Sequence, residues 1–403
     1  MYNFNTQCGL TLVAINVGAL ACGSSTEFAS FTSSESSVGG QVSLTSSTLG
    51  GTAGIGGTAG IGGTSTVVSA GGDTSLSVGG TAPFSATGGT SAHVDAGAPV
   101  WRNSTVPFCP TDKLSAFLPT RLSLWSDSRG VFLMARETSE TIYFNDGNGW
   151  SVNYSDRKAI GNLIALTGFT GGPLVRYGVT PCGIEVMANG VFVCSAGMDE
   201  VSTVFTINQQ LAYGSYANQP IAYDGARWTE WGNALSPSDD YILSLWASEN
   251  TVALGTFYGR VYKYVNADPT QAVLLPGLPE ARNLALWGFA SDNLWVGNND
   301  GQIYRYDGSS WSPVWTATDQ CGAIRGMWGA SNSLYFITDS LIGAIRNGQV
   351  EILVNYGCNS PIQVQSLWGN SGSEVFFALT DSSQPDCGRI KVLWYDGANL
   401  SAI

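Results

Sequence analysis

The chain has 403 residues, a net charge of −13 and a single histidine, His93. Its 17 lysines and arginines form no basic cluster, which argues against binding to nucleic acid or to anionic membrane surfaces through charge. Because no histidine follows His93, the rest of the chain cannot form a Ser-His-Asp triad, use a histidine as general base or hold a metal through histidine.

The first 21 residues have the pattern of a lipoprotein signal peptide. The apolar run from Leu10 to Ala21 is too short to span a bilayer as a helix and suits a signal-peptide core. Small residues before Cys22 resemble a lipoprotein cleavage box, so we expect residues 1–21 to be removed and Cys22 to be lipidated. Two departures weaken this prediction: the leucine of the box is displaced to Leu20, and no lysine or arginine precedes the run. Ordinary secretion and no export are the alternatives.

Residues 22–100 are mostly Gly, Ser, Thr and Ala. A segment of this composition cannot bury enough apolar surface to offset the entropy lost on ordering. We therefore expect a disordered, flexible tether. A small glycine-rich β-module is the alternative, because Val67-Val68 and Leu76 offer some apolar surface.

Residues 101–403 contain a repeat that opens with an apolar residue and a tryptophan. These pairs occur at 245–246, 286–287, 327–328 and 367–368, at intervals of about 40 residues. Within the units, short apolar runs are separated by Asn-Gly and Asp-Gly pairs such as Asp307-Gly308. Such runs predict antiparallel strands joined by tight two-residue hairpins, and four short strands per unit.

Seven units follow from the spacing. Trp125 opens the first unit, and two degenerate openings without tryptophan fall near Ile164-Ala165 and Val204-Phe205. Repeats of about 40–45 residues with four strands each are typical of all-β propellers, whose closed ring leaves only short sheet edges. We therefore predict a seven-bladed β-propeller over 101–403. Six or eight blades follow if a weak repeat is miscounted, and a solenoid of stacked hairpins is the structural alternative.

The units resemble a known pattern: Leu-Trp-Gly, an aromatic-Val-Gly strand, a Gly-x-Ile hairpin and Tyr-Asp-Gly-x-x-Trp, as at residues 286–311. Units of this kind occur in surface and periplasmic lipoproteins of soil bacteria, which carry a propeller behind a Gly/Ser/Thr-rich tether. The resemblance covers most of residues 115–403. It implies a fold and a place in the outer membrane or on the cell surface, but no shared activity.

Six cysteines follow the tether, an even number that fits disulfides in an oxidising compartment. The expected pairs, in order of preference, are Cys321 with Cys358, Cys109 with Cys387, and Cys182 with Cys194. The first pair joins neighbouring loops, and the second would lock the closure of the ring. A regular hairpin register around Asn189-Gly190 fits the third pair poorly.

Acidic residues gather on loops that a propeller brings to one face. In four-stranded blades, the loops between blades and the loops between second and third strands open on the same side. We expect this face to be acidic. Docking of a cationic partner or a divalent ion is one interpretation of it, and the favoured interpretation is that these residues are ordinary turn formers that keep the loops solvated. The candidate ligand residues are Asp112, Asp239, Asp240, Glu280, Asp319, Asp381 and Asp386.

The recurring tryptophans have two interpretations. They either form a stacking ring for sugars near the channel or, as residues repeated in every blade usually do, pack the blades. Packing is the favoured interpretation. The residues concerned are Trp125, Trp246, Trp287, Trp328 and Trp368.

Catalysis by carboxylates remains open, since Asp and Glu are common in the chain and a glycosidase needs two of them about 5–10 Å apart. The Ser-x-Asp-x-Gly-x-Thr-Trp box of sialidase propellers is only partly echoed at 125–130 and 144–150. The sequence therefore predicts an exported, lipid-anchored propeller that binds a protein or glycan partner without catalysis, with no cofactor and no metal. A glycoside-directed enzyme and a structural envelope component are the alternatives.

Overall fold

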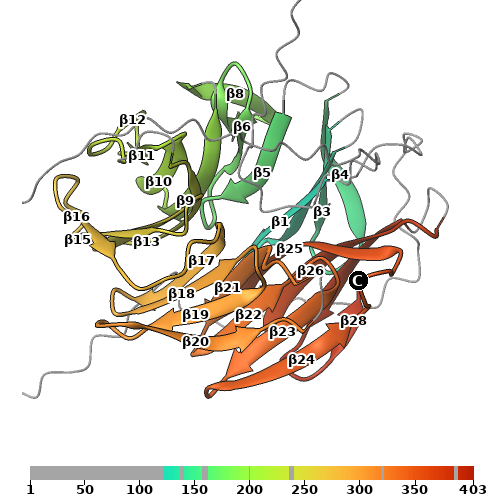
Figure 1. The fold of residues 1–403 in the computed structure, drawn as a ribbon. Coiled ribbons are helices and arrows are strands. Elements are labelled where there is room, and N and C mark those ends of the chain that lie inside the picture. The colour runs from blue at the N-terminus through green and yellow to red at the C-terminus, as the bar shows by residue number, and fades with distance from the viewer. Residues whose placement is uncertain are drawn as a thin grey trace, which may run out of the picture. The chain divides into compact units, whose positions relative to one another are not determined.

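The computed structural model describes residues 121–136, 140–156, 162–198, 200–235, 240–318, 322–384 and 389–403. Over these residues, 28 strands form seven four-stranded antiparallel sheets. Figure 1 shows the sheets as blades around a central axis, with the colour advancing from one blade to the next. The predicted seven-bladed all-β propeller is confirmed. The predicted signal peptide, Cys22 and tether lie outside the described residues.

Each blade uses four consecutive strands. Blade 1 is β1 (Arg121–Asp127), β2 (Gly130–Arg136), β3 (Glu140–Asn145) and β4 (Trp150–Asp156). Blade 2 is β5 (Asn162–Gly168), β6 (Leu174–Val179), β7 (Gly183–Ala188) and β8 (Val191–Gly197). Blade 3 is β9 (Val201–Asn208), β10 (Leu211–Tyr216), β11 (Gln219–Tyr223) and β12 (Trp228–Glu230).

The remaining blades follow the same order. Blade 4 is β13 (Ile242–Ser248), β14 (Thr251–Thr256), β15 (Val261–Val265) and β16 (Ala272–Leu275). Blade 5 is β17 (Asn283–Ala290), β18 (Asn293–Asn298), β19 (Gln302–Tyr306) and β20 (Trp311–Thr316). Blade 6 is β21 (Gly326–Ala330), β22 (Ser333–Ile337), β23 (Leu341–Arg346) and β24 (Gln349–Asn355). Blade 7 is β25 (Ile362–Ser371), β26 (Glu374–Asp381), β27 (Ile390–Tyr395) and β28 (Leu400–Ala402).

The first strand of each blade is the innermost, and it contacts the first strand of the next blade around the whole ring. The two degenerate openings predicted from the spacing are β5 and β9. Thr167 of β5 pairs with Val175, and Phe205 of β9 pairs with Tyr213, at the position where Trp125 of β1 pairs with Phe132. The repeat therefore continues through blades 2 and 3 although its tryptophan does not.

The ring closes where blade 7 meets blade 1, and no strand is shared between them. Gln365 Oε1 accepts a hydrogen bond from the Leu122 amide at 3.0 Å, and Ser366 Oγ accepts one from the Leu124 amide at 3.0 Å. On the outer side, Trp150 Nε1 donates to the Ile403 carbonyl at 3.0 Å. Apolar side chains of both blades fill the space between these bonds.

The turns between third and fourth strands have two residues, four residues or, in blade 4, six residues at 266–271. Asn189-Gly190 and Asn347-Gly348 are two-residue turns with positive φ at both positions, as predicted. The prediction is wrong for Asp307-Gly308, because the loop between β19 and β20 has four residues. The Asp307 carboxylate accepts the amides of Ser309 and Ser310, both at 2.9 Å, and Gly308 has φ +97°.

The tyrosine that precedes these aspartates completes the Tyr-Asp-Gly motif. Tyr306 Oη donates to the carbonyl of Gly308 at 2.8 Å, and the same bond recurs at 2.9 Å in blade 3, from Tyr223 to Gly225. Tyr395 in blade 7 repeats it a third time. The motif therefore specifies a four-residue loop and not a two-residue hairpin. The Asp carboxylate, the Gly with positive φ and the Tyr hydroxyl hold this loop closed.

Cys182 and Cys194 form a disulfide in blade 2, with their Cα atoms 5.5 Å apart. This pair was the least expected of the three. The backbone departs twice from a regular hairpin, because Gly183 has φ +71° and the register between β7 and β8 shifts at Ile184 and Glu185. Cys358 is also disulfide-bonded, to a cysteine outside the described residues. The expected partners Cys109, Cys321 and Cys387 lie outside the described residues too.

Candidate functional site

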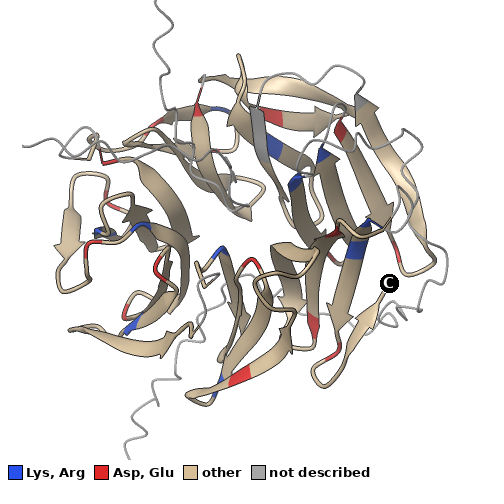
Figure 2. Ribbon diagram, turned by 45° about the vertical axis from the view of Figure 1, so that its right-hand side comes forward, with Lys and Arg blue, Asp and Glu red and all other residues tan. Residues whose placement is uncertain are grey.

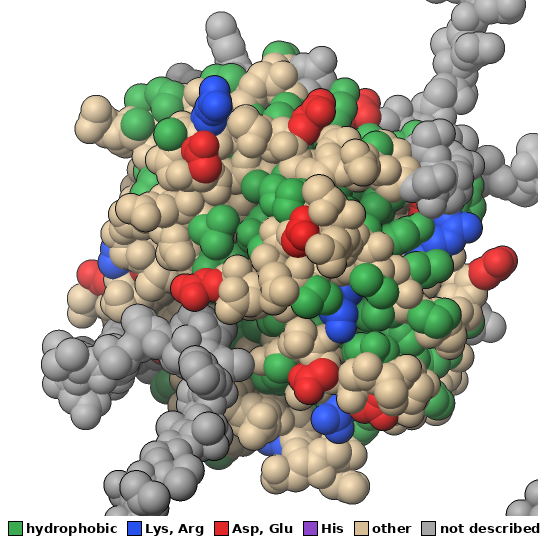
Figure 3. Space-filling model, turned by 90° about the vertical axis from the view of Figure 1, so that its left-hand side faces the viewer, with side chains coloured by type: hydrophobic (Ala, Val, Ile, Leu, Met, Phe, Trp, Pro, Cys, Tyr) green, Lys and Arg blue, Asp and Glu red, His purple; other side chains and the backbone are tan. Residues whose placement is uncertain are grey.

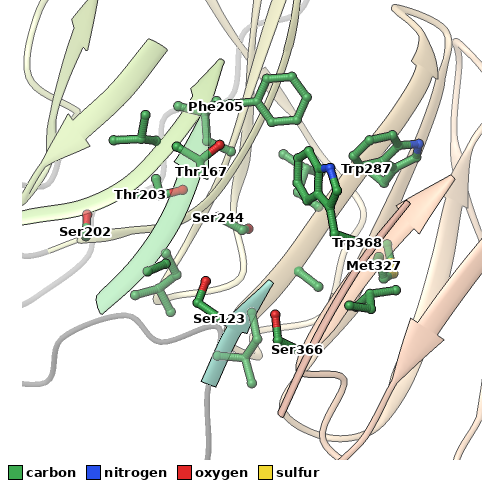
Figure 4. Close-up of a pocket in the computed structure, with 18 of the residues that line it drawn as sticks. Ser123, Thr167, Ser202, Thr203, Phe205, Ser244, Trp287, Met327, Ser366 and Trp368 are labelled. Carbon is green, nitrogen blue, oxygen red and sulfur yellow. The ribbon is translucent and has the colours of Figure 1, made fainter. Parts of the chain in front are cut away.

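The central channel holds a cavity of about 90 Å³, bordered by the innermost strands. Figure 4 shows its lining, in which Phe205, Trp287 and Trp368 project towards one space from blades 3, 5 and 7. The rings of Phe205 and Trp287 lie 5.9 Å apart between centroids, although their blades are not neighbours. These aromatic side chains therefore narrow the channel from opposite sides.

Most tryptophans of the predicted stacking ring do not reach this cavity. Trp125, Trp246 and Trp328 are only 2%, 4% and 5% exposed. Each packs on a glycine of the next blade, and a Cβ on Gly288, for example, would lie 2.7 Å from the Trp246 ring. Gly168 and Gly369 play the same part for Trp125 and Trp328. These three tryptophans therefore pack the blades against one another, as the favoured interpretation predicted.

The same rule explains why other aromatic side chains turn towards the channel. The position that faces Trp368 in the next blade is Ser126, and the position that faces Phe205 is Ala247. A Cβ at these positions occupies the space that a glycine leaves open for an aromatic ring. Trp368 and Phe205 are half-buried at the cavity. Trp287 is half-buried there too, although a Cβ on Gly329 of the next blade would lie 2.9 Å from its Nε1, so the glycine position is not the whole cause. In blade 2 two hydroxyls meet instead, since Thr167 Oγ1 lies 3.3 Å from Thr206 Oγ1.

Serine hydroxyls join neighbouring blades around the channel, a role that the sequence analysis missed. Ser123 Oγ accepts the Leu166 amide at 3.0 Å, and Ser244 Oγ donates to the Asn283 carbonyl at 2.9 Å. Together with Ser366 at the ring closure, these residues share one position, directly before the Leu-Trp pair. The recurrence of Ser-Leu-Trp in three blades is the sequence signal from which this role could have been predicted.

The channel lining is uncharged, since it contains no Asp, Glu, Lys, Arg or His. Its one tyrosine, Tyr177, is buried, and burial raises its pKa to about 12. The cavity is also far smaller than the roughly 300–1,000 Å³ of pockets that enclose a small-molecule ligand. The described lining therefore holds no group that titrates near neutral pH, and the cavity is smaller than such pockets.

The predicted ligand residues that the structure describes, Asp240, Glu280 and Asp381, lie on what we call the inter-blade face, formed by the loops between blades and between second and third strands. Asp240 is fully buried, and its carboxylate bonds Arg260 Nη1 at 2.9 Å and the Tyr258 amide at 3.0 Å. Asp381 is 3% exposed and bonds Lys391 Nζ at 2.7 Å. Of the other candidates, Glu280 is exposed, and Asp112, Asp239, Asp319 and Asp386 lie outside the described residues.

Each of these two carboxylates is therefore matched by a base within its own blade. Arg325 and Asp339 of blade 6 form a third such pair at 2.9 Å. Figure 2 shows both signs of charge distributed around the ring, and Figure 3 shows them scattered singly over one side of the molecule. Over the described residues, the carboxylates of Asp240 and Asp381 tie loops together, and whether the inter-blade face binds a ligand stays a prediction.

Further acidic residues lie on the opposite face, in the turns between third and fourth strands. Backbone amides hold each carboxylate and lower its pKa, to about 2 for Asp307. The other aspartates with this arrangement are Asp146, Asp224 and Asp396. Their charge serves the turns, because the carboxylates accept amides two or three residues ahead.

A buried ionic cluster lies between blades 1 and 2. Arg176 Nη1 bonds Glu140 Oε1 at 2.6 Å, and Arg176 Nε bonds Glu185 Oε2 at 2.5 Å. The guanidinium also lies over the ring of Phe192, 4.2 Å from its centroid. Burial raises the pKa of Glu140, although Arg176 and Arg136 favour its charged form. The cluster is buried away from solvent and connects the two blades structurally.

Two features are absent from the described residues. No group of three or more His, Cys, Asp or Glu side chains is placed to hold a metal ion. Within the same residues, no helix has the length and apolar character needed to cross a membrane.

No protein-family model and no curated protein matches the chain. Solved structures do match it. A catalytically inactive variant of virginiamycin B lyase from Staphylococcus aureus with quinupristin has a TM-score of 0.56 at 12% identity, covering 74% of this chain and 98% of that one. The selenomethionine form of the same lyase gives 0.53 at 12% identity, over 69% and 96%. A streptogramin B lyase gives 0.55 at 13% identity, over 75% and 99%. At such identities the likeness concerns the fold.

Proposed function

We propose that this chain is an exported, lipid-anchored β-propeller that binds a protein or glycan at the cell envelope without catalysing a reaction. In this proposal residues 1–21 are a lipoprotein signal peptide, Cys22 carries the lipid, and residues 22–100 hold the propeller away from the outer membrane or cell surface. The apolar run before Cys22 and the Gly, Ser, Thr and Ala composition of the tether support it.

The observation that carries the non-catalytic part is the uncharged channel. General acid and base catalysis requires a titratable group within hydrogen-bond reach of the reacting atoms. The cavity lining provides only hydroxyl, aliphatic and aromatic side chains. A surface that binds on exposed loops, rather than a reaction inside the channel, fits this lining best.

The structural likeness to lyases is the reason to weigh an enzyme. One of those structures is of a histidine-to-alanine variant described as catalytically inactive. The single histidine of this chain is His93, ahead of the propeller strands. A reaction that depends on a propeller histidine therefore has no residue to carry it here.

A glycoside-directed enzyme is the second candidate, and a structural envelope component is the third. The glycosidase needs two converging carboxylates. Asp240 and Asp381, the two described candidates with known partners, are each engaged by a base. The glycosidase would therefore have to use carboxylates outside the channel lining.

The test is to probe the purified, oxidised, exported chain on a glycan array and to cross-link it to its neighbours in intact envelopes. Selective capture of a glycan or of one protein is the expected result. Mass spectrometry of the released sugars, and of quinupristin incubated with the chain, detects turnover. Cleavage of either compound would replace the proposal with an enzyme, and silence in every assay would leave the structural component.

The anchor is tested with Cys22→Ala. Because a thioether-linked lipid is the only membrane attachment in the proposal, we expect this variant to leave the membrane fraction. Cell fractionation followed by mass spectrometry of the N-terminal peptide measures it. Unchanged membrane association of Cys22→Ala would rule out lipidation at this residue.

A further inference from the structure

Three exposed tyrosines lie on neighbouring loops of the inter-blade face. Tyr216 ends β10, Tyr241 precedes β13, and Tyr258 lies between β14 and β15, with exposed fractions of 39%, 45% and 42%. They are the only aromatic residues among the exposed large hydrophobic residues of the described chain. The aliphatic ones lie on strands elsewhere: Val152, Val191, Val193, Val265, Val273, Leu274 and Ile352.

The loops that carry these tyrosines are fastened to one another. The Ile242 amide donates to the Ala217 carbonyl at 3.1 Å, which joins the loop after Tyr216 to the start of β13. The Phe257 amide donates to the Tyr241 carbonyl at 2.9 Å, which joins β13 to the next loop. We call Tyr216, Tyr241 and Tyr258 the tyrosine platform. Loops held in this way present aromatic rings with little ordering left to occur on binding.

Among the described residues, the centre of the platform carries no free charge. Asp240, directly before Tyr241, is buried, and Arg260 and the Tyr258 amide hold its carboxylate. At the edge, the Arg282 guanidinium lies over the Phe257 ring, 4.3 Å from its centroid. Arg282 makes no side-chain hydrogen bond or ion pair within the described residues. Its donors are therefore fixed in direction and available to a ligand.

We propose that the tyrosine platform binds a neutral oligosaccharide. Aromatic faces pack against the C–H faces of sugar rings, phenolic hydroxyls exchange hydrogen bonds with sugar hydroxyls, and a stacked guanidinium donates to further hydroxyls. An uncharged ligand complements the neutral centre of the platform. The inference rests on the proposed binding function and selects a glycan over a protein, because no exposed aliphatic residue of the described chain extends the patch.

The test measures the affinity of the full exported chain for immobilised neutral hexasaccharides of glucose, xylose and N-acetylglucosamine. Tyr216→Ala, Tyr241→Ala and Tyr258→Ala should each weaken binding about tenfold. A combined Val191→Ala, Val273→Ala and Ile352→Ala variant removes equally exposed apolar side chains elsewhere and should bind as the wild type does. Tyr241→Phe keeps the ring and should retain most of the affinity.

A second measurement needs no variant. Saturating oligosaccharide should protect the three tyrosines from nitration by tetranitromethane in the wild-type chain, with the sites located by mass spectrometry. Oligosaccharide binding without this protection, or undiminished in the alanine variants, would overturn the platform but not the proposed function. Failure to bind any neutral hexasaccharide would overturn the inference, while the cross-linking experiment still decides whether a protein partner exists.

Discussion

The guanidinium of Arg176 lies at hydrogen-bond distance from two carboxylates, those of Glu140 and Glu185, which are buried with it. Two acidic groups share one base, so their charge is balanced only with help from nearby Arg136. Removing one partner of a buried ion pair leaves an uncompensated charge, which is far more costly than the pair is stabilising. The residue therefore links blades 1 and 2 through its ion pair with Glu140 and through its position over the Tyr154 ring of blade 1, 5.4 Å from the centroid.

We expect Arg176→Met to lower the free energy of unfolding by about 3–5 kcal/mol at neutral pH. The loss should shrink on acidification, because Glu140, whose pKa is raised by burial, becomes neutral in the folded state. The sign follows from the raised pKa of Glu140: protonation favours the folded state, so the penalty disappears as the pH falls through that value. Urea unfolding at pH 7 and pH 5 measures both effects.

Arg227 provides the matched control, since its side chain is exposed at a turn and its backbone amide, not its guanidinium, donates to the Asp224 carboxylate. Arg227→Met should change the free energy of unfolding by no more than about 0.5 kcal/mol at either pH. A pH-independent loss in Arg176→Met would show that packing, and not the buried charge, is what the residue supplies.

At the scale of the blade, the contact between an aromatic ring and the glycine of the next blade sets the spacing between sheets. The ring of Trp246 occupies the place where a Cβ on Gly288 would be. Cores that are packed to this density do not accept an added methyl group without shifting backbone or rotamers. The Trp-Gly pairing therefore spans two consecutive units of the repeat.

Gly288→Ala should destabilise the propeller by about 1–3 kcal/mol through overpacking. Gly197→Ala is the control, because no atom lies within 4 Å of a Cβ built there and its φ is not positive. Thermal unfolding followed by tryptophan fluorescence compares the two variants, and the emission of Trp246 should respond only to the first. Equal melting temperatures for both variants would contradict the seating of Trp246 on Gly288.

The repeat predicted the strands well because their period depends on local pattern, but it predicted loops and cross-links less well. Asp307-Gly308 looks like a two-residue turn in sequence, and only the reach of the carboxylate to Ser310 shows that the loop is longer. The bond between Cys182 and Cys194 depends on a register shift between β7 and β8 that the residue types do not predict. Likewise, the pairing of Asp240 with Arg260 joins residues whose spacing follows neither strand nor turn.

At the scale of the whole molecule, six of the seven contacts between blades are also joined by the chain, and the contact between blades 7 and 1 is not. Within the described residues, its hydrogen bonds through Gln365 and Ser366 have no covalent connection beside them. The contact between blades 4 and 5 has an equivalent bond, from Ser244 to the Asn283 carbonyl, beside a continuous chain. A comparison of Ser366 with Ser244 therefore tests how much a continuous chain adds to the contact between two blades.

Ser366→Ala removes the acceptor of the Leu124 amide and should cost about 1–3 kcal/mol, because a buried donor loses its partner. Hydrogen exchange should accelerate in β1 and β25 first, as blades 1 and 7 separate. Ser244→Ala is the matched control and should leave exchange in β1 unchanged. Uniform acceleration over all seven blades would mean that the ring opens only by global unfolding.

The junction of the first and last blades also decides how the molecule would respond to mechanical force. A pull on the chain ahead of Arg121 acts directly on β1, which blade 7 holds only by side-chain bonds and packing. Within blade 1 the same strand is held by a ladder of seven residue pairs with β2. Tension should therefore separate blade 1 from blade 7 before it pulls β1 away from β2. The ring would then open at this one contact while the other blades stay folded.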